Sequence, residues 1–82
     1  ASMTDWDIRM QTGLRIKELR AAADLSQDDL AYAIDMSRSY LAEVETGKRN
    51  ISLQNLERIA RGLGITLDEF FDSGYFRRGA DA

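Results

Sequence analysis

The 82-residue chain contains no cysteine, no proline and no histidine. Without cysteine it can form neither a disulfide framework nor a thiolate metal site. Because histidine is also absent, a structural zinc site and a Ser-His-Asp triad are excluded. No apolar run approaches the length that crosses a membrane, and no secretory signal is visible. We therefore expect a soluble protein of the cytoplasm without a metal or cofactor.

The chain is short, and its charges are unevenly placed. With 82 residues, 44% of them hydrophobic, it is predicted to form one compact domain with a small core. A core of that size gives limited stability, so a partner subunit is expected to add to it. The formal net charge of −3 argues at first sight against nucleic-acid binding. The basic residues Arg38, Lys48 and Arg49 nevertheless lie close together in the chain, away from the acids near residue 70.

Residues 27–46 have the pattern of two short helices joined by a tight corner at 35–36. Ser26 is the expected N-cap of the first helix, and Ser37 is the expected N-cap of the second. Apolar residues recur at helical spacing in both helices. The predicted buried residues are Leu30, Ala31, Ile34, Leu41 and Val44. The second helix therefore has one buried side and one side of small and polar residues.

The exposed side of the second helix has the chemistry of a surface that reads DNA bases. An arginine in its first turn can make a bidentate contact to guanine, and a glutamate can accept from the amino group of cytosine. A small residue between them allows close approach. The candidate base contacts are Arg38, Ser39, Ala42 and Glu43. From this stretch alone, an ordinary two-helix corner with a solvated polar side remains an equal alternative.

The surrounding sequence moves the balance towards DNA binding through a family resemblance. The segments S-Q-D-D-L-A and S-R-S-Y-L-A-E-V-E-T-G-K-R-N resemble the helix-turn-helix of phage-repressor and Cro-like (XRE-type) transcriptional regulators. The resemblance extends upstream over R-I-K-E-L-R at 15–20 and downstream over 51–71. It therefore covers most of the chain. Within that family, E-T-G-K-R-N-I-S-L and the tyrosine after S-R-S are most similar to controller proteins of restriction–modification systems.

The resemblance implies an all-α domain of five helices, like that of lambda repressor, which binds double-stranded DNA. It implies a homodimer that reads a palindromic operator through the helix at 37–46 and regulates transcription. It also implies an ion pair between Arg20 and Glu45 that positions this helix. In the family the corner residue is usually a left-handed glycine, and here Asp35 stands in its place.

A second group of residues is predicted to contact the DNA backbone. Gly47 ends the recognition helix, and a polar loop follows it. Ser52 caps the next helix, whose N-terminus can offer N–H groups to a phosphate. The resemblance implies the same for Gln27 at the start of the preceding helix. The candidate phosphate contacts are Gln27, Ser37, Tyr40, Lys48, Arg49 and Asn50, and the alternative for each is a solvated loop or cap.

The remaining chain completes the predicted domain. Ala1 and Ser2 precede Met3 and are interpreted as a cloning remnant, 3–76 as a single helix-turn-helix domain, and 77–82 as a flexible tail. Gly13 is expected to interrupt the first helix. A final helix is expected over 67–72, ended by the pair at 73–74. The aromatic candidates for a dimer interface are Phe71, Tyr75 and Phe76, and packing of these side chains on their own subunit is an equal alternative.

Other functions remain open at this stage. The aromatic pair at 75–76 leaves room for an antitoxin, whose main partner is a toxin protein. The chain could also be the DNA-binding module of a larger, ligand-responsive regulator. The carboxylates are scattered or adjacent in the chain, and the glycines are isolated, so neither an acid/base pair nor a phosphate-binding loop is indicated. We therefore do not expect an enzyme, nor is a small-molecule ligand or a membrane partner indicated.

Overall fold

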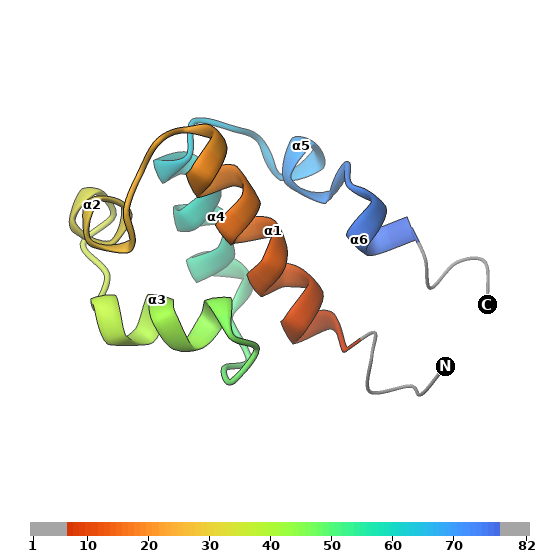
Figure 1. Ribbon diagram of the computed structural model, residues 1–82, viewed down its shortest axis with the longest axis horizontal. Coiled ribbons are helices and arrows are strands. Elements are labelled where there is room, and N and C mark those ends of the chain that lie inside the picture. The colour runs from red at the N-terminus through yellow and green to blue at the C-terminus, as the bar shows by residue number, and fades with distance from the viewer. Residues whose placement is uncertain (1–6, 78–82) are drawn as a thin grey trace.

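The computed structural model describes residues 7–77 and contains six helices within that range. The helices are α1 (Ile8–Ala22), α2 (Gln27–Ala33), α3 (Arg38–Glu45), α4 (Leu53–Gly62), α5 (Leu67–Phe71) and α6 (Gly74–Arg77). In Figure 1, α2 and α3 lie on one side of the long α1, while α5 and α6 lie on its other side. The predicted all-α fold with a helix-turn-helix is confirmed, with one short helix more than the five expected.

Side-chain caps explain where several helices begin. Ser26, Ser37 and Ser52 each precede a helix, and each hydroxyl oxygen accepts from the backbone N–H three residues later. At the start of α2 the cap is reciprocal, because the Asp29 carboxylate accepts from the N–H of Ser26 at 3.1 Å. Asp7 serves α1 in a similar way by accepting from the N–H of Arg9 at 2.9 Å. A hydrogen bond from the Arg9 side chain lowers the pKa of Asp7 to about 2.

The four longest helices end in the same way. The first residue after each C-cap is left-handed, with φ values of 58°, 53°, 79° and 76° at Asp24, Asp35, Gly47 and Gly64. The next N–H returns to a carbonyl five residues earlier, as in Met36 to Ala31 at 2.8 Å. This Schellman geometry turns the chain sharply without wasting helix carbonyls. The corner at Asp35 is therefore left-handed, as predicted, and an aspartate is tolerated there.

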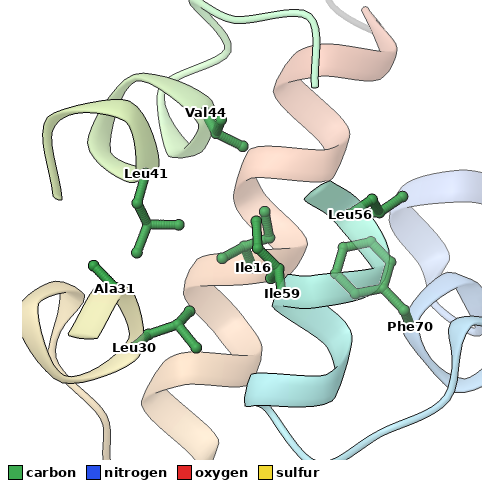
Figure 2. Close-up of a cluster of buried hydrophobic side chains, with 8 residues drawn as sticks. All are labelled: Ile16, Leu30, Ala31, Leu41, Val44, Leu56, Ile59 and Phe70. Carbon is green, nitrogen blue, oxygen red and sulfur yellow. The ribbon is translucent and has the colours of Figure 1, made fainter. Parts of the chain in front are cut away.

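One cluster of buried side chains joins five of the helices (Figure 2). Ile16 of α1 and Ile59 of α4 lie at its centre, and both are fully buried. Phe70 closes the end of the core beneath α5. The complete cluster consists of Ile16, Leu30, Ala31, Leu41, Val44, Leu56, Ile59 and Phe70. The buried side chains of α2 and α3 predicted from helical spacing belong to it, except for Ile34, which packs on its edge.

The expected interruption at Gly13 was wrong. The helix α1 runs unbroken through this position from Ile8 to Ala22. Gly13 is buried, and a Cβ built on it would lie 2.4 Å from the backbone oxygen of Glu45. The absence of a side chain therefore allows the backbones of α1 and α3 to touch. The glycine marks a close helix contact and not a helix end.

The expected helix end before 73–74 is confirmed, because α5 ends at Phe71, but a further short helix that was not predicted follows it. Gly74 begins the short helix α6, whose first turn is capped because the Ser73 hydroxyl accepts from the N–H of Tyr75 at 3.2 Å. Arg77, predicted to start the tail, is the last residue of α6 and pairs with the Asp72 carboxylate. The predicted cloning remnant at 1–2 and the rest of the tail at 78–82 lie outside the described residues.

Across the described part of the chain, no helix has the length and apolar character needed to span a membrane. Among residues 7–77, acidic side chains do not gather in a group that could hold a metal ion.

Candidate nucleic-acid interface

Helix α3 has a buried side and a side open to the surroundings. Its buried residues are Leu41, Val44 and Glu45. On the opposite side Arg38 and Ser39 are exposed, and Ala42 and Glu43 are half-buried. The four predicted base contacts thus share one open side of a helix that lies at the edge of the fold (Figure 1). An exposed helix of this kind can enter a DNA major groove.

The buried end of α3 is held by an ion pair between Arg20 and Glu45. The guanidinium donates from Nε to Oε2 at 2.7 Å and from Nη2 to Oε1 at 2.8 Å. The Glu45 side chain is 1% exposed. The hydrogen bond to Glu45 raises the pKa of Arg20 above its usual value. Because both prongs of the fork are used, the pair fixes direction as well as distance.

Glu45 links α3 to both α1 and α2. Gln27, the first residue of α2, donates from Nε2 to Glu45 Oε1 at 3.1 Å. Arg20 donates its remaining Nη1 to the carbonyl oxygen of Leu25 at 2.9 Å. The side chain of Gln27 is therefore oriented by a buried carboxylate. Together with the backbone contact at Gly13, this network sets how α3 sits on the domain.

A second set of contacts steadies the outer end of α3 and the loop behind it. Tyr40 is half-buried, and its hydroxyl oxygen accepts from Asn55 Nδ2 of α4 at 3.2 Å. The Arg49 guanidinium lies 5.4 Å from the centre of the Tyr40 ring, within the range of a cation–π contact. Arg58 donates to the carbonyl oxygens of Ile34 and Asp35 at the corner.

Asn55 and Arg58 were not found by sequence reasoning. Their partners are 15 to 24 residues away along the chain, so no local pattern connects them. The one available sign of such contacts was that both residues are polar and lie on the polar side of an amphipathic helix.

Both arginines on the open side are paired with acids. Arg38 Nε lies 2.9 Å from Asp28 Oδ1, and Arg49 Nε donates to Glu43 Oε1 at 2.8 Å. The hydrogen bond to Glu43 also raises the pKa of Arg49. All four side chains are at least 44% exposed. These are surface pairs, which a better partner can replace.

The loop after α3 differs in one respect from the other Schellman turns. After the left-handed residue, the other three turns place an apolar side chain, Leu25, Met36 or Ile65, each partly buried. The α3 turn places Lys48 there, and it is exposed. Arg49 and Asn50 follow it and are exposed too. The turn after α3 therefore lacks the apolar packing contact of the other turns and has exposed polar side chains in its place.

The three aromatic residues proposed for a dimer interface have different surroundings. Phe76 packs on its own subunit, with its ring centre 4.9 Å from Phe71 and 6.1 Å from Phe70. Tyr75 is half-buried, and its carbonyl oxygen accepts from the Gln11 side chain. Phe71 remains 39% exposed. It lines a groove with two other exposed apolar side chains, Ile8 and Leu53, which sequence reasoning did not select.

Known proteins are similar in sequence to this chain over most of its length. A family model described as helix-turn-helix matches residues 16–70. The chain belongs to the helix-turn-helix family. It is 52% identical over 66 residues to the control protein C.MunI of a Mycoplasma species, covering 79% of this chain and 89% of that protein. This places it among the controller proteins, and the matches are to regulators, as predicted, and not to enzymes.

Solved structures agree with this assignment. The restriction-modification controller protein C.AhdI from Aeromonas hydrophila is 43% identical, with a TM-score of 0.74 over 77% of this chain and 96% of that chain. The controller protein C.Esp1396I, as a tetramer in complex with its natural 35-base-pair operator, is 29% identical. Its TM-score is 0.76 over 88% of this chain and 90% of that chain. This helix-turn-helix protein therefore has the fold of the controller proteins.

Proposed function

We propose that this helix-turn-helix protein binds double-stranded DNA in a sequence-specific way and regulates transcription. The observation that carries the proposal is the structure of α3. A buried ion pair and a direct backbone contact fix the helix on one side. Its other side presents a row of exposed or half-buried residues without a packing role. Recognition helices combine a rigid support with such an open polar side.

The side chains on α3 have separate proposed roles. Arg38 can make a bidentate contact to guanine O6 and N7, and Glu43 can accept from cytosine N4. Ser39 can bond either kind of base edge, and Ala42 allows the helix to approach closely. Their first-turn and mid-helix positions match the part of a recognition helix that meets base edges.

The proposed backbone contacts surround α3. The Tyr40 hydroxyl accepts from Asn55, so its own hydrogen remains to be donated to a phosphate oxygen. Ser37 accepts a cap bond and likewise keeps its hydrogen. Gln27 is oriented by Glu45. Contacts of this kind fix the register of the protein on the duplex. The full proposed set is Gln27, Ser37, Tyr40, Lys48, Arg49 and Asn50.

Two copies of the chain are proposed to bind together. The relative C.Esp1396I is described as a tetramer on its operator, and a two-fold dimer would place two recognition helices on half-sites about one helical turn apart. We place the dimer contact at the groove with Ile8, Leu53 and Phe71, whose side chains are 56%, 81% and 39% exposed. Phe76 packs against Phe71 of this surface, and Tyr75 remains a further candidate contact.

Sedimentation at low and high concentration tests the dimer surface. We expect Leu53→Ser to shift the protein towards the monomer, because it removes the most exposed apolar side chain of the groove. Tyr32→Ser is the control, since Tyr32 is 91% exposed but belongs to α2. Equal association of both variants and wild type would move the dimer contact elsewhere.

The relatives favour a regulator over an antitoxin as the main function. They include bacterial control proteins, and in bacteria the operator DNA lies in the cytoplasm. We accordingly propose that the protein acts in the cytoplasm, on DNA, without a cofactor.

Selection from a random duplex library tests the proposed function. The wild-type protein is expected to enrich a palindromic motif with two half-sites about one helical turn apart. A lack of enrichment at both low and moderate salt would contradict DNA recognition.

A further inference from the structure

The exposed pair between Arg38 and Asp28 joins the first turns of two helices. Arg38 is the first residue of α3, and Asp28 is the second residue of α2. Arg38 Nε lies 2.9 Å from Asp28 Oδ1, and the two side chains are 65% and 75% exposed. The neighbouring Asp29 serves the helix cap instead, because its carboxylate accepts from the N–H of Ser26.

The pair leaves the outer end of the guanidinium available. The atom of Arg38 that lies against Asp28 is Nε, at 2.9 Å from Oδ1. Nη1 and Nη2 are the end-on donors that can meet O6 and N7 of guanine. Because Nε joins the guanidinium to the rest of the side chain, a carboxylate at Nε leaves the two terminal nitrogens for a base contact.

The pair also affects differently the two properties of arginine that matter for DNA binding, its hydrogen-bond donors and its positive charge. Base edges are neutral acceptors, so they reward donors in the right direction. Phosphates reward net positive charge, because binding releases counterions. An arginine paired with a carboxylate keeps its outward donors but contributes almost no net charge. It is therefore a poor ligand for arbitrary DNA and remains a good ligand for guanine.

On the basis of the proposed function, we propose that Asp28 is a specificity-determining residue. It acts through Arg38, by orienting the guanidinium towards a base edge and by cancelling the charge that would attract any phosphate. The consequence is a larger ratio of operator affinity to random-duplex affinity. Asp28 is a positioning residue and need not touch DNA.

Asp28→Asn tests this role with two duplexes, the selected operator and a scrambled duplex of equal length. The variant is expected to bind the scrambled duplex about fivefold more tightly, with a salt slope about one unit steeper, because one cation is uncovered. Operator affinity should change less than about twofold, since the lost orientation offsets the gained charge. The specificity ratio should therefore fall.

Glu57→Gln is the matched control. Glu57 forms an exposed pair with Arg61 on α4, and the substitution makes the same change in net charge. It should leave the specificity ratio unchanged. An equal fall in both variants would overturn the proposal, because overall charge would then explain the effect. A melting curve for each variant checks that it folds.

The background of Arg38→Ala tests whether Asp28 acts through Arg38. There, Asp28→Asn should no longer change the specificity ratio, since the charge it cancels is gone. An equal fall in this background would overturn the proposal and show that Asp28 acts on DNA directly. If wild type does not prefer the operator over the scrambled duplex, the proposed function fails, and this inference fails with it. A preference in wild type that Asp28→Asn leaves intact overturns the inference alone.

Discussion

The two ends of α3 carry the same kind of interaction with opposite consequences. At its C-terminal end, Glu45 is 1% exposed and accepts two bonds from Arg20. At its N-terminal end, Arg38 pairs with Asp28, and both side chains are more than half exposed. Removing one partner of a buried ion pair strongly destabilises the folded protein, because the other charge stays buried without a partner. An exposed pair contributes little to stability.

A small domain can in this way combine a fixed helix with an adaptable surface. The buried pair removes freedom from α3, so its orientation is determined before DNA arrives. The exposed pairs leave donors of their arginines open to solvent, so DNA acceptors can be added beside the carboxylates. Rigid support reduces the entropy lost on binding. The same kind of ion pair thus fixes the position of a helix where it is buried and leaves side chains available for recognition where it is exposed to solvent.

Breaking the buried pair should have the largest effect. We expect Glu45→Ala to lower the free energy of unfolding by about 2–4 kcal/mol, because Arg20 would be left without its carboxylate in a partly buried place. Glu57→Ala, which breaks an exposed pair, should cost less than about 1 kcal/mol. Urea unfolding of both variants measures the two values. Equal values would remove the distinction between the two kinds of pair.

The backbone contact at Gly13 should come next. Gly13→Ala places a methyl group against the backbone of Glu45 and Val44, and backbone cannot move aside as a flexible side chain can. We expect a loss of about 1–3 kcal/mol from overpacking, despite the better helix propensity of alanine. Gly74→Ala is the control, because nothing lies within 4 Å of a Cβ there. A stabilised Gly13→Ala protein would show that α1 and α3 can separate freely.

Removing Arg49 should have the smallest and least selective effect. Arg49→Ala is expected to weaken binding to operator and scrambled duplexes alike and to reduce the salt slope by about one unit. Arg61→Ala on α4 removes the same charge away from the proposed interface. Binding isotherms at several salt concentrations give the slopes. A loss confined to the operator would reassign Arg49 from phosphate to base contact.

Local chemistry accounts for what could be predicted from the sequence. Serine caps and left-handed turn residues mark helix ends, and helical spacing marks the buried sides of α2 and α3. The pair of Arg20 and Glu45 was expected from a family resemblance, and the structure contains it. Spacing alone would not have paired residues that are 25 positions apart.

The features that escaped prediction depend on tertiary contact. Gly13 looked like a helix breaker because its packing partner is a backbone more than thirty residues away. Asp28 was not among the predicted site residues, because its link to Arg38 depends on how α2 and α3 meet at the corner. For Phe76 the sequence left open a partner or its own subunit, and it packs on Phe71 of its own chain. In each case sequence identifies the residue but not its neighbour.

If the open side of a fixed α3 reads DNA bases, removal of Arg38 must change which bases are selected. Selection from a random duplex library should be repeated with Arg38→Ala beside wild type, after melting curves show equal stability. We expect a palindromic motif for wild type and relaxed preference at one position of each half-site for the variant, with operator affinity lower by about 1–3 kcal/mol. An identical motif from both proteins would contradict base reading by this helix.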